Sequence, residues 1–363
     1  MKILQLIQKQ QLRGAEIFAA QLSEELLGQG NEVILVSLFE GVSKLPFSGR
    51  CICLEANSDK RFWDFKTWKK LAALIAEFQP DIVQANAGDT LKYAAFSRLL
   101  FGWKAKLIFR NANMISGFVT SIPKKIYNDF LLRQVAGIAS VSAICARDFI
   151  QTFSFPESKV EVLPIGVLPV KETLNLPEDL IKILGASDFL IHIGSFVPEK
   201  NHQELFLIFD QILLKFPDLK LLLLGEGPLK PHFQNQFTDR SEILFAGVRT
   251  DVDAILPFAK ALLLPSLIEG LPGVILEAMN SLVPMISYNV GGISEVVSPE
   301  TGWLVPKADR GQFVKAVVEV LSFDNKSKLK IQQNAKQLVE DHYQVSVLAK
   351  RFEIFYKERI RIN

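Results

Sequence analysis

Two glutamates, Glu269 and Glu277, stand on either side of a turn that contains two glycines and a proline, with seven residues between them. A carboxylate on each side of such a turn can accept hydrogen bonds from the hydroxyls of a sugar or a ribose. Glycines let a ligand approach the backbone closely, and the free amides of a helix that starts here suit a phosphate. The spacing alone supports equally well a solvated loop charge at Glu269 and a helix-dipole partner at Glu277.

The turn follows an apolar run at 261–264, which predicts a buried strand whose carboxyl end carries the turn. Ligands of open α/β sheets bind at such ends. Short apolar runs alternate with amphipathic segments along the whole chain, a pattern typical of parallel sheets covered by helices on both faces. The predicted strands are 2–7, 33–38, 81–85, 106–109, 137–141 and 160–163, then 189–193, 219–224, 243–246, 261–264 and 284–287. The sequence therefore predicts the α/β class, with two Rossmann-like, doubly wound domains.

The prolines and the glycine of residues 163–170 indicate a connector between the two series of strands. We expect an N-terminal domain at 1–165, a C-terminal domain at 166–344 and a terminal helix at 345–363. Four large apolar side chains at helical spacing give that helix one buried face: Leu348, Phe352, Phe355 and Tyr356. We expect it to cross back to the N-terminal domain.

Composition excludes several classes of protein. The 363 residues carry a formal net charge of only +2, which argues against a nucleic-acid partner. Three cysteines form no disulfide framework, and four histidines without a Cys/His pattern predict no zinc site. The first strand precedes no Gly-x-Gly-x-x-Gly fingerprint, so a nicotinamide cofactor is not expected. Without a signal-peptide core or a long apolar run, we expect a cytoplasmic protein.

Five runs in order resemble those of a known family, the retaining GT-B glycosyltransferases of family 4, also called glycosyl transferases group 1. They include the two-glutamate turn with its seven-residue spacing and the segments 194–202, 224–229, 245–247 and 291–295. The resemblance covers nearly the whole chain and is strongest between Gly194 and Pro306. It implies transfer of a sugar from a nucleotide-sugar donor to an acceptor, with retained anomeric configuration and no bound metal or cofactor.

The resemblance also implies roles for individual residues. Glu277 would hold the ribose hydroxyls of the nucleotide, Glu269 would hold hydroxyls of the donor sugar, and Lys200 would balance the charge of the diphosphate. The alternative for Lys200 is a surface lysine after a strand. The implied donor site further includes Gly14, Ser195, Gly270, Gly273, Val274 and Ile275, among which the amides around Gly273 and Val274 add to the charge of Lys200.

Two departures from the family pattern matter. The family commonly has an arginine where this chain has Ser195, and Arg249 is predicted to compensate in the donor site unless it is an exposed loop arginine. Many relatives carry a histidine after an N-domain strand, whereas all four histidines here lie in the C-terminal half. The matching strand, 106–109, runs into polar residues instead. We predict a catalytic role for Asn111 and acceptor-side roles for Arg110, Asn113 and Arg13; a turn with left-handed asparagines is the alternative.

A basic, aromatic segment at 60–71 bears on the acceptor. Helical spacing predicts Phe65, Trp68, Ala72 and Ile75 on a core face. Three lysines gather on the opposite face with two aromatics among them: Lys66, Lys69, Lys70, Phe62 and Trp63. Such a mixture suits the headgroups of an anionic membrane, and a solvated lysine face with tucked aromatics is the alternative.

Together these features predict a retaining glycosyltransferase that uses a UDP-sugar and a glycan or lipid-linked acceptor. The donor is expected mainly on the C-terminal domain and the acceptor mainly on the N-terminal one. The expected setting is bacterial surface-polysaccharide or lipopolysaccharide assembly, peripheral to the inner face of the membrane. The rivals are a nucleotide-sugar epimerase or a phosphorylase of the same fold, and a degenerate, non-catalytic nucleotide-sugar-binding protein.

Overall fold

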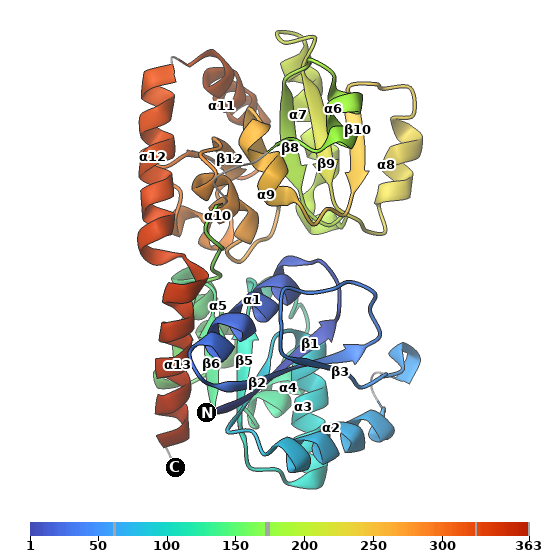
Figure 1. The fold of residues 1–363 in the computed structure, drawn as a ribbon, viewed down its shortest axis with the longest axis vertical. Helices are drawn as coiled ribbons and strands as arrows, with labels where there is room; N and C mark the ends of the chain where they lie inside the picture. The colour runs from blue at the N-terminus through green and yellow to red at the C-terminus, as the bar shows by residue number, and fades with distance from the viewer. Residues whose placement is uncertain (61–62, 171–174, 324, 362–363) are drawn as a thin grey trace. The chain divides into compact units, whose positions relative to one another are not determined.

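The computed structural model describes residues 1–60, 63–170, 175–323 and 325–361. The chain divides into two compact units. Unit 1 comprises Met1–Gly166 and Val345–Asn363, and unit 2 comprises Val167–Gln344. Each unit is a parallel sheet with helices on its faces, as Figure 1 shows.

Unit 1 contains seven parallel strands in the order β3-β2-β1-β4-β5-β6-β7. The strands are β1 (Lys2–Lys9), β2 (Glu32–Phe39), β3 (Arg50–Cys53), β4 (Ile82–Ala85), β5 (Lys106–Asn111), β6 (Gly137–Ser140) and β7 (Val160–Val162). The helices are α1 (Gly14–Gly28), α2 (Phe65–Phe78), α3 (Gly88–Phe101), α4 (Ile122–Leu132), α5 (Ala143–Phe153) and α13 (Val345–Arg361). The strand order reverses between β1 and β4, and such switch points are where doubly wound sheets bind ligands.

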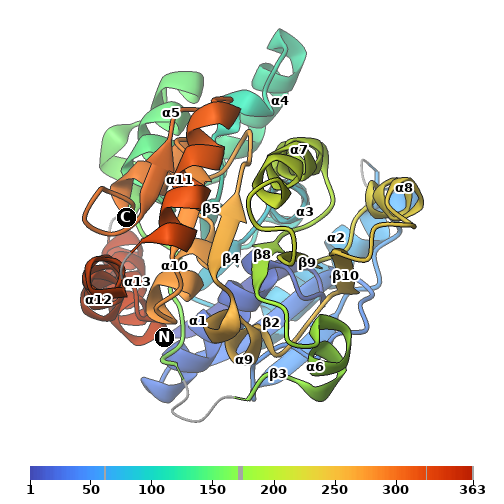
Figure 2. The same ribbon diagram turned by 90° about the horizontal axis from the view of Figure 1, so that it is seen from above.

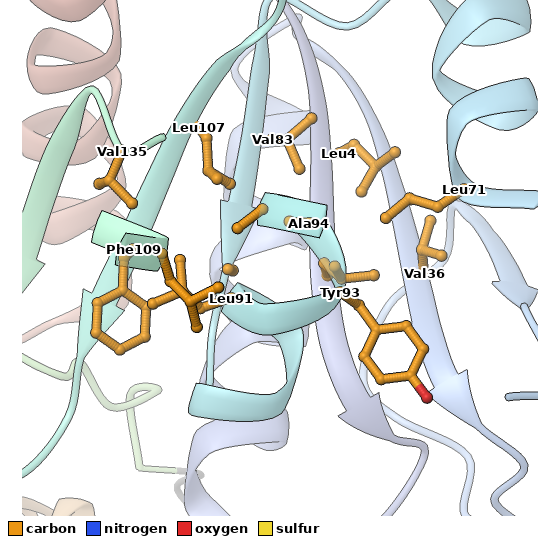
Figure 3. Close-up of a cluster of buried hydrophobic side chains, with 14 of the residues drawn as sticks. Leu4, Val36, Leu71, Val83, Leu91, Tyr93, Ala94, Leu107, Phe109 and Val135 are labelled. Atoms are coloured by element: carbon orange, nitrogen blue, oxygen red, sulfur yellow. The ribbon is translucent and has the colours of Figure 1, made fainter. Parts of the chain in front are cut away.

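Successive side chains of the unit 1 strands point to opposite faces of the sheet, and helices cover each face. Leu4, Val36, Val83 and Leu107 face the layer that holds α2 and α3, where Tyr93 and its neighbours complete one hydrophobic core (Figure 3). The opposite face is covered by α1 and α13 (Figure 2). Both layers exclude water from the sheet, as a parallel sheet requires.

Helix α13 is fastened to the sheet of unit 1 by a buried polar network. The Tyr356 hydroxyl donates to Gln84 Oε1 at 2.6 Å and accepts from Gln5 Nε2 at 3.3 Å. Asn86 donates to Gln5 Oε1 at 2.9 Å. Phe352 of the same helix meets Phe18 of α1 with ring centroids 6.1 Å apart. The terminal helix therefore belongs to unit 1 although it follows the whole of unit 2 in sequence.

Unit 2 repeats the arrangement with six parallel strands in the order β10-β9-β8-β11-β12-β13. The strands are β8 (Phe189–Ile193), β9 (Lys220–Leu224), β10 (Ile243–Gly247), β11 (Ala261–Leu264), β12 (Met285–Tyr288) and β13 (Trp303–Val305). The helices are α6 (Glu178–Leu184), α7 (His202–Leu213), α8 (Lys230–Gln236), α9 (Val252–Ile255), α10 (Gly273–Asn280), α11 (Arg310–Ser322) and α12 (Asn325–His342). Its strand order reverses between β8 and β11.

The structure confirms the predicted α/β class with two Rossmann-like sheets. Sequence reasoning missed two strands, β3 and β13, and each is a short strand at the edge of its sheet. The prediction that Phe65 lies in the core was wrong, because 54% of it is exposed. Helix α2 begins at Phe65, directly after the capping residue Asp64, and the ring contacts Phe101 at 5.5 Å instead of the sheet.

Candidate functional site

Lys200 and Glu269 meet at the switch point of unit 2. Lys200 ends a short 3-10 turn, Pro198–Lys200, that follows β8, and Glu269 lies in the loop after β11. Because β8 and β11 are neighbours, their carboxyl ends bring the two side chains together. Lys200 Nζ donates to Glu269 Oε1 at 2.5 Å, with 19% and 7% of the side chains exposed. The two residues predicted to act at the donor sugar and diphosphate thus form one ion pair.

Three loops fix the position of Glu269. Asn201 donates to the carbonyl of Pro265 at 3.1 Å, which joins the loop after β8 to the loop after β11. The loop after β12 closes the third side, where Gly292 N donates to Gly270 O at 2.6 Å. At Gly291, φ is +56° and a Cβ would lie 2.0 Å from the carbonyl oxygen of Glu269, so only glycine fits. The backbone that carries Glu269 is therefore held by contacts that do not depend on a ligand.

Two buried imidazoles lie beneath the ion pair and carry no charge at neutral pH. Burial, with a contribution from the charge of Lys200, lowers the pKa of His192 to about 4. Burial also lowers the pKa of His202 to about 2, and the ring stacks on Phe196 with centroids 4.1 Å apart. Sequence reasoning assigned neither histidine a role, although His202 ends one of the family-like runs. Neither imidazole therefore adds a second positive charge close to Lys200 at neutral pH.

Glu277 lies on α10, the helix that follows the same loop. Its side chain is partly exposed, and its carboxylate has no hydrogen-bond or ion-pair partner among the described residues. Burial, and secondly the charge of Asp253, raises the pKa of Glu277 to about 7. The carboxyl group is therefore available to hydroxyl donors and changes its charge near neutral pH.

The first turn of α10 offers two amides. The helix begins at Gly273 after Pro272, which supplies no side-chain cap. Gly273 and Val274 are half-buried, and their amides precede the first intrahelical bond. Ile275 is fully buried and its amide donates to the carbonyl of Pro272 at 3.2 Å. Of the three residues predicted for this turn, Ile275 is thus buried with its amide bonded, whereas Gly273 and Val274 are partly exposed.

Two other predicted donor-site residues of unit 2 differ in environment. Ser195 is half-buried in the loop after β8. Arg249 is neither free nor an exposed loop arginine, because its guanidinium bonds Asp251 at 2.6 Å and Asp179 at 2.6 Å. Two carboxylates already balance its charge, so this geometry does not support the predicted donor-binding role.

Arg110 and Asn111, predicted to follow a strand that ends at residue 109 and to take part in the site, are instead the last residues of β5 and are buried. The Arg110 guanidinium packs over the ring of Phe18 at 4.5 Å, and its Nε and Nη1 have no hydrogen-bond partner among the described residues. Burial lowers the pKa of Arg110 to about 10, although the nearby Tyr356 and Glu16 act in the opposite direction. Arg110 therefore points into the interior of unit 1.

The amide of Asn111 is occupied by its own unit. Its Nδ2 donates to Ser140 Oγ and to the carbonyl of Cys145, both at 3.2 Å, and ties β5 to β6 and α5. Neither Asn111 nor Asn113 has a left-handed backbone, which contradicts the alternative of an asparagine turn. The groups that unit 1 exposes at this edge are Asn113 and, at the start of α1, Arg13 and Gly14.

The basic segment before and within α2 is partly accessible. Trp63 is 85% exposed, so it is not tucked away, and Lys66 and Lys69 are exposed beside it. Lys70 instead donates to the carbonyl of Leu54 at 2.9 Å and pairs with Glu55 at 3.0 Å. Phe62, the other aromatic of the predicted patch, lies outside the described residues. In the described part of the chain, no helix has the length and apolarity to cross a membrane, and no acidic, histidine or cysteine cluster suits a metal ion.

Family models match both halves of the chain. The model described as Glycosyltransferase Family 4 matches residues 12–169, and the one described as Glycosyl transferases group 1 matches residues 187–322. The chain belongs to the group 1 glycosyltransferases. The predicted family is thereby confirmed.

Curated relatives of this glycosyltransferase include two bacterial enzymes. The Escherichia coli UDP-Gal:alpha-D-GlcNAc-diphosphoundecaprenol alpha-1,3-galactosyltransferase is 29% identical over 45% of each chain. The capsular polysaccharide biosynthesis glycosyltransferase CapM of Staphylococcus aureus is 25% identical over 81% of each. The matches to the first three relatives span 45%, 66% and 46% of their lengths.

Solved structures share the fold of this glycosyltransferase across almost the whole chain. HepE of Anabaena, solved in complex with UDP and glucose, has a TM-score of 0.83 and 17% identity, with 98% and 99% of the two chains covered. The sucrose-phosphate synthase of Thermosynechococcus elongatus has a TM-score of 0.82 and 17% identity, with 98% of each chain covered. Both comparisons confirm the two-domain GT-B fold.

Proposed function

We propose that this protein is a retaining, metal-independent glycosyltransferase that moves a hexose from a UDP-sugar to a lipid-linked glycan. The observation that carries the proposal is the Lys200–Glu269 ion pair at the switch point of unit 2. The helix after the loop of Glu269 adds the carboxyl of Glu277, which has no partner among the described residues. A transferase of this kind must stabilise a departing diphosphate and orient the sugar that it leaves. The three side chains are the types that this task needs.

Lys200 uses one of its three N–H donors on Glu269 and keeps the others for phosphate oxygens. The charge is already in place before the donor binds, so it stabilises the diphosphate as negative charge develops without costly reorganisation. The amides of Gly273 and Val274 add two neutral donors at the start of α10.

The two glutamates bind hydroxyl groups in the proposed complex. Glu269 accepts only one hydrogen bond from Lys200, so its remaining lone pairs can accept hydroxyls of the donor sugar. Glu277 accepts the ribose hydroxyls, and its ionised form is the better acceptor. We propose a smaller contribution from Ser195, Gly270 and Gly14 at the donor, and from Arg13 and Asn113 at the acceptor.

The relatives support the choice of donor and acceptor. The Escherichia coli relative is named for UDP-Gal and a diphosphoundecaprenol-linked sugar, and HepE was solved with UDP and glucose. CapM is named for capsular polysaccharide biosynthesis. We therefore place the reaction in the assembly of a bacterial surface polysaccharide, on the inner face of the membrane.

A panel of UDP-, GDP- and ADP-sugars tests the proposal. Tight binding by one UDP-hexose, followed by transfer to a lipid-linked glycan in excess chelator, is the expected result. Loss of turnover with chelator and recovery with magnesium would contradict the metal-free mechanism. Conversion of the donor alone, with no acceptor present, would instead support the epimerase.

The Glu277→Ala variant tests the nucleotide part of the proposed site, because Glu277 is proposed to bind the ribose and not the donor sugar. We expect its affinity for UDP to fall by roughly 1–3 kcal/mol through lost charge-assisted hydrogen bonds. Glu269→Gln should leave UDP affinity near that of the wild type, since the proposed partners of Glu269 are on the sugar. Calorimetry that finds equal UDP affinity for Glu277→Ala and wild type would remove Glu277 from the ribose.

A further inference from the structure

Helix α4 of unit 1 turns an apolar stripe outward. Ile122, Ile126 and Phe130 follow one another at intervals of four residues, and 75%, 63% and 41% of them are exposed. This spacing places the three side chains on one side of the helix. Leu131 on the other side of the helix is buried in the core of unit 1. Ile122 and Ile126 thus lie outside the face that holds α4 in the fold, whereas Phe130 also meets Phe96 with ring centroids 6.2 Å apart.

The loop before the helix adds a fourth exposed apolar side chain, Phe118, of which 41% is exposed. Isolated exposed apolar residues are common on protein surfaces, but a continuous row of large ones marks an interaction site. Helix α4 lies on the same side of the sheet as α2 and α3, and it packs against α3 (Figure 2).

Basic side chains flank the row. Residues 118–133 contain three basic residues against one acidic residue. The acid, Asp129, is already paired with Lys125 at 3.1 Å, whereas Lys124 and Arg133 are exposed and pair with no carboxylate among the described residues. Isoleucine and phenylalanine side chains bordered by unpaired cations match an anionic lipid surface. The acyl chains of the lipids accommodate the apolar side chains, and the anionic headgroups attract the cations.

We propose that the α4 face, defined as Phe118, Ile122, Ile126 and Phe130 with Lys124 and Arg133, seats the protein on an anionic bilayer. A second copy of the chain fits this face less well. A twofold contact would bring the same cations of both copies together, with Asp129 already neutralised. The eleven-residue helix lies in the interface and does not span the membrane.

The seating has a consequence for the acceptor. The loop that leads into α4 starts at the carboxyl end of β5, the edge of unit 1 where Asn113 is exposed. A bilayer in contact with Phe118 and Ile122 therefore lies beside the proposed acceptor edge, which favours an acceptor anchored in that bilayer. This second step rests on the proposed function, whereas the seating itself does not.

Vesicle sedimentation tests the seating. The full chain should sediment with vesicles that contain phosphatidylglycerol and much less with pure phosphatidylcholine, and added salt should release it. Ile122→Ser/Ile126→Ser should lower the bound fraction at least tenfold. The matched control is Ile181→Ser/Ile183→Ser on α6 of unit 2, where the two isoleucines are 49% and 45% exposed, and it should bind as the wild type does.

Two further variants separate the α4 face from the other candidate surface. Lys124→Glu/Arg133→Glu should abolish the preference for anionic vesicles. Trp63→Ser/Phe65→Ser, which removes the exposed aromatics beside α2, should cost less than the α4 change if α4 is the principal contact. UDP affinity should be unchanged in all four variants, because no substituted residue belongs to the proposed donor site. Thermal melting should be unchanged in the α4 and α6 variants, whose substituted side chains are exposed.

Several outcomes would overturn the proposal. Wild-type protein that ignores vesicles, binds neutral and anionic vesicles equally, or binds equally after Ile122→Ser/Ile126→Ser would do so. A dimer in sedimentation equilibrium that the same variant dissociates, without vesicle binding, would assign the face to a second copy. Failure of UDP binding or sugar transfer with intact vesicle binding would refute the proposed function and leave the seating in place.

Discussion

The carboxyl edges of the two sheets use charge in opposite ways. At the edge of unit 2, Lys200 and Glu269 extend from loops after the strands and meet where solvent still reaches them. At the edge of unit 1, Arg110 and Asn111 are still inside β5 and are buried, paired across the ladder with Ala139 and Ser140. Polar residues after an apolar run thus form a candidate ligand site only where the strand has ended.

The charged groups at the two edges also differ in how their burial is compensated. A buried ion pair holds two charges whose desolvation is offset by their attraction, so loss of one partner leaves the other uncompensated. Arg110 has the charge of Glu16 nearby but no hydrogen bond to it, and burial raises the pKa of Glu16. The charged groups of unit 2 therefore remain partly accessible to a ligand, whereas the charge of Arg110 is buried inside unit 1.

Removal of Lys200 tests the unit 2 side of the comparison and should have the largest effect. Lys200→Met deletes the cation proposed for the diphosphate, and we expect transfer to slow by about 10²- to 10³-fold. It also leaves Glu269 unpaired, so the melting temperature should fall and should recover in Lys200→Met/Glu269→Gln without recovery of the rate. A single variant that keeps more than a tenth of the wild-type rate would remove Lys200 from the reaction.

Asn111 tests the unit 1 side. Asn111→Ala loses two buried hydrogen bonds, to Ser140 Oγ and to the carbonyl of Cys145, and should lower the free energy of unfolding by about 1–3 kcal/mol in urea titrations. Asn113→Ala is the control, because Asn113 is exposed, and its stability should equal that of the wild type. A stable Asn111→Ala protein that has lost transfer would restore the catalytic role predicted from the sequence.

The same difference between the two sheet edges shows which features of the fold and the site the sequence predicts. The alternation of apolar runs predicts both parallel sheets, and the structure confirms them. The end of the strand at 106–109 was predicted two residues early, because an arginine and an asparagine resemble a turn when their partners are unknown. Those partners, Phe18 for Arg110 and Ser140 for Asn111, come from other elements of the chain. Local pattern therefore predicts elements better than it predicts which polar side chains they bury.

The titration of Glu277 gives a smaller, pH-dependent effect. With its pKa raised to about 7, the carboxyl is mostly protonated at pH 6 and mostly ionised at pH 8. If only the ionised form accepts both ribose hydroxyls, UDP should bind about tenfold more tightly at pH 8 than at pH 6. The diphosphate titrates near pH 6 itself, so Glu277→Gln is the control that isolates the glutamate. Calorimetry that finds the same pH dependence in both proteins would refute the assignment.

Substitution of Arg249 should have the smallest effect on UDP affinity. It tests whether an arginine that is already paired with two carboxylates can still bind a diphosphate. Its guanidinium bonds both Asp251 and Asp179, so a diphosphate would have to displace a carboxylate to reach it. Arg249→Gln should therefore change UDP affinity less than twofold in calorimetry, far less than Lys200→Met does. An Asp179→Asn variant frees part of the guanidinium without removing it, and UDP affinity should again stay the same. A loss above tenfold in Arg249→Gln, or a gain in Asp179→Asn, would show that Arg249 supplies the second phosphate cation that Ser195 lacks.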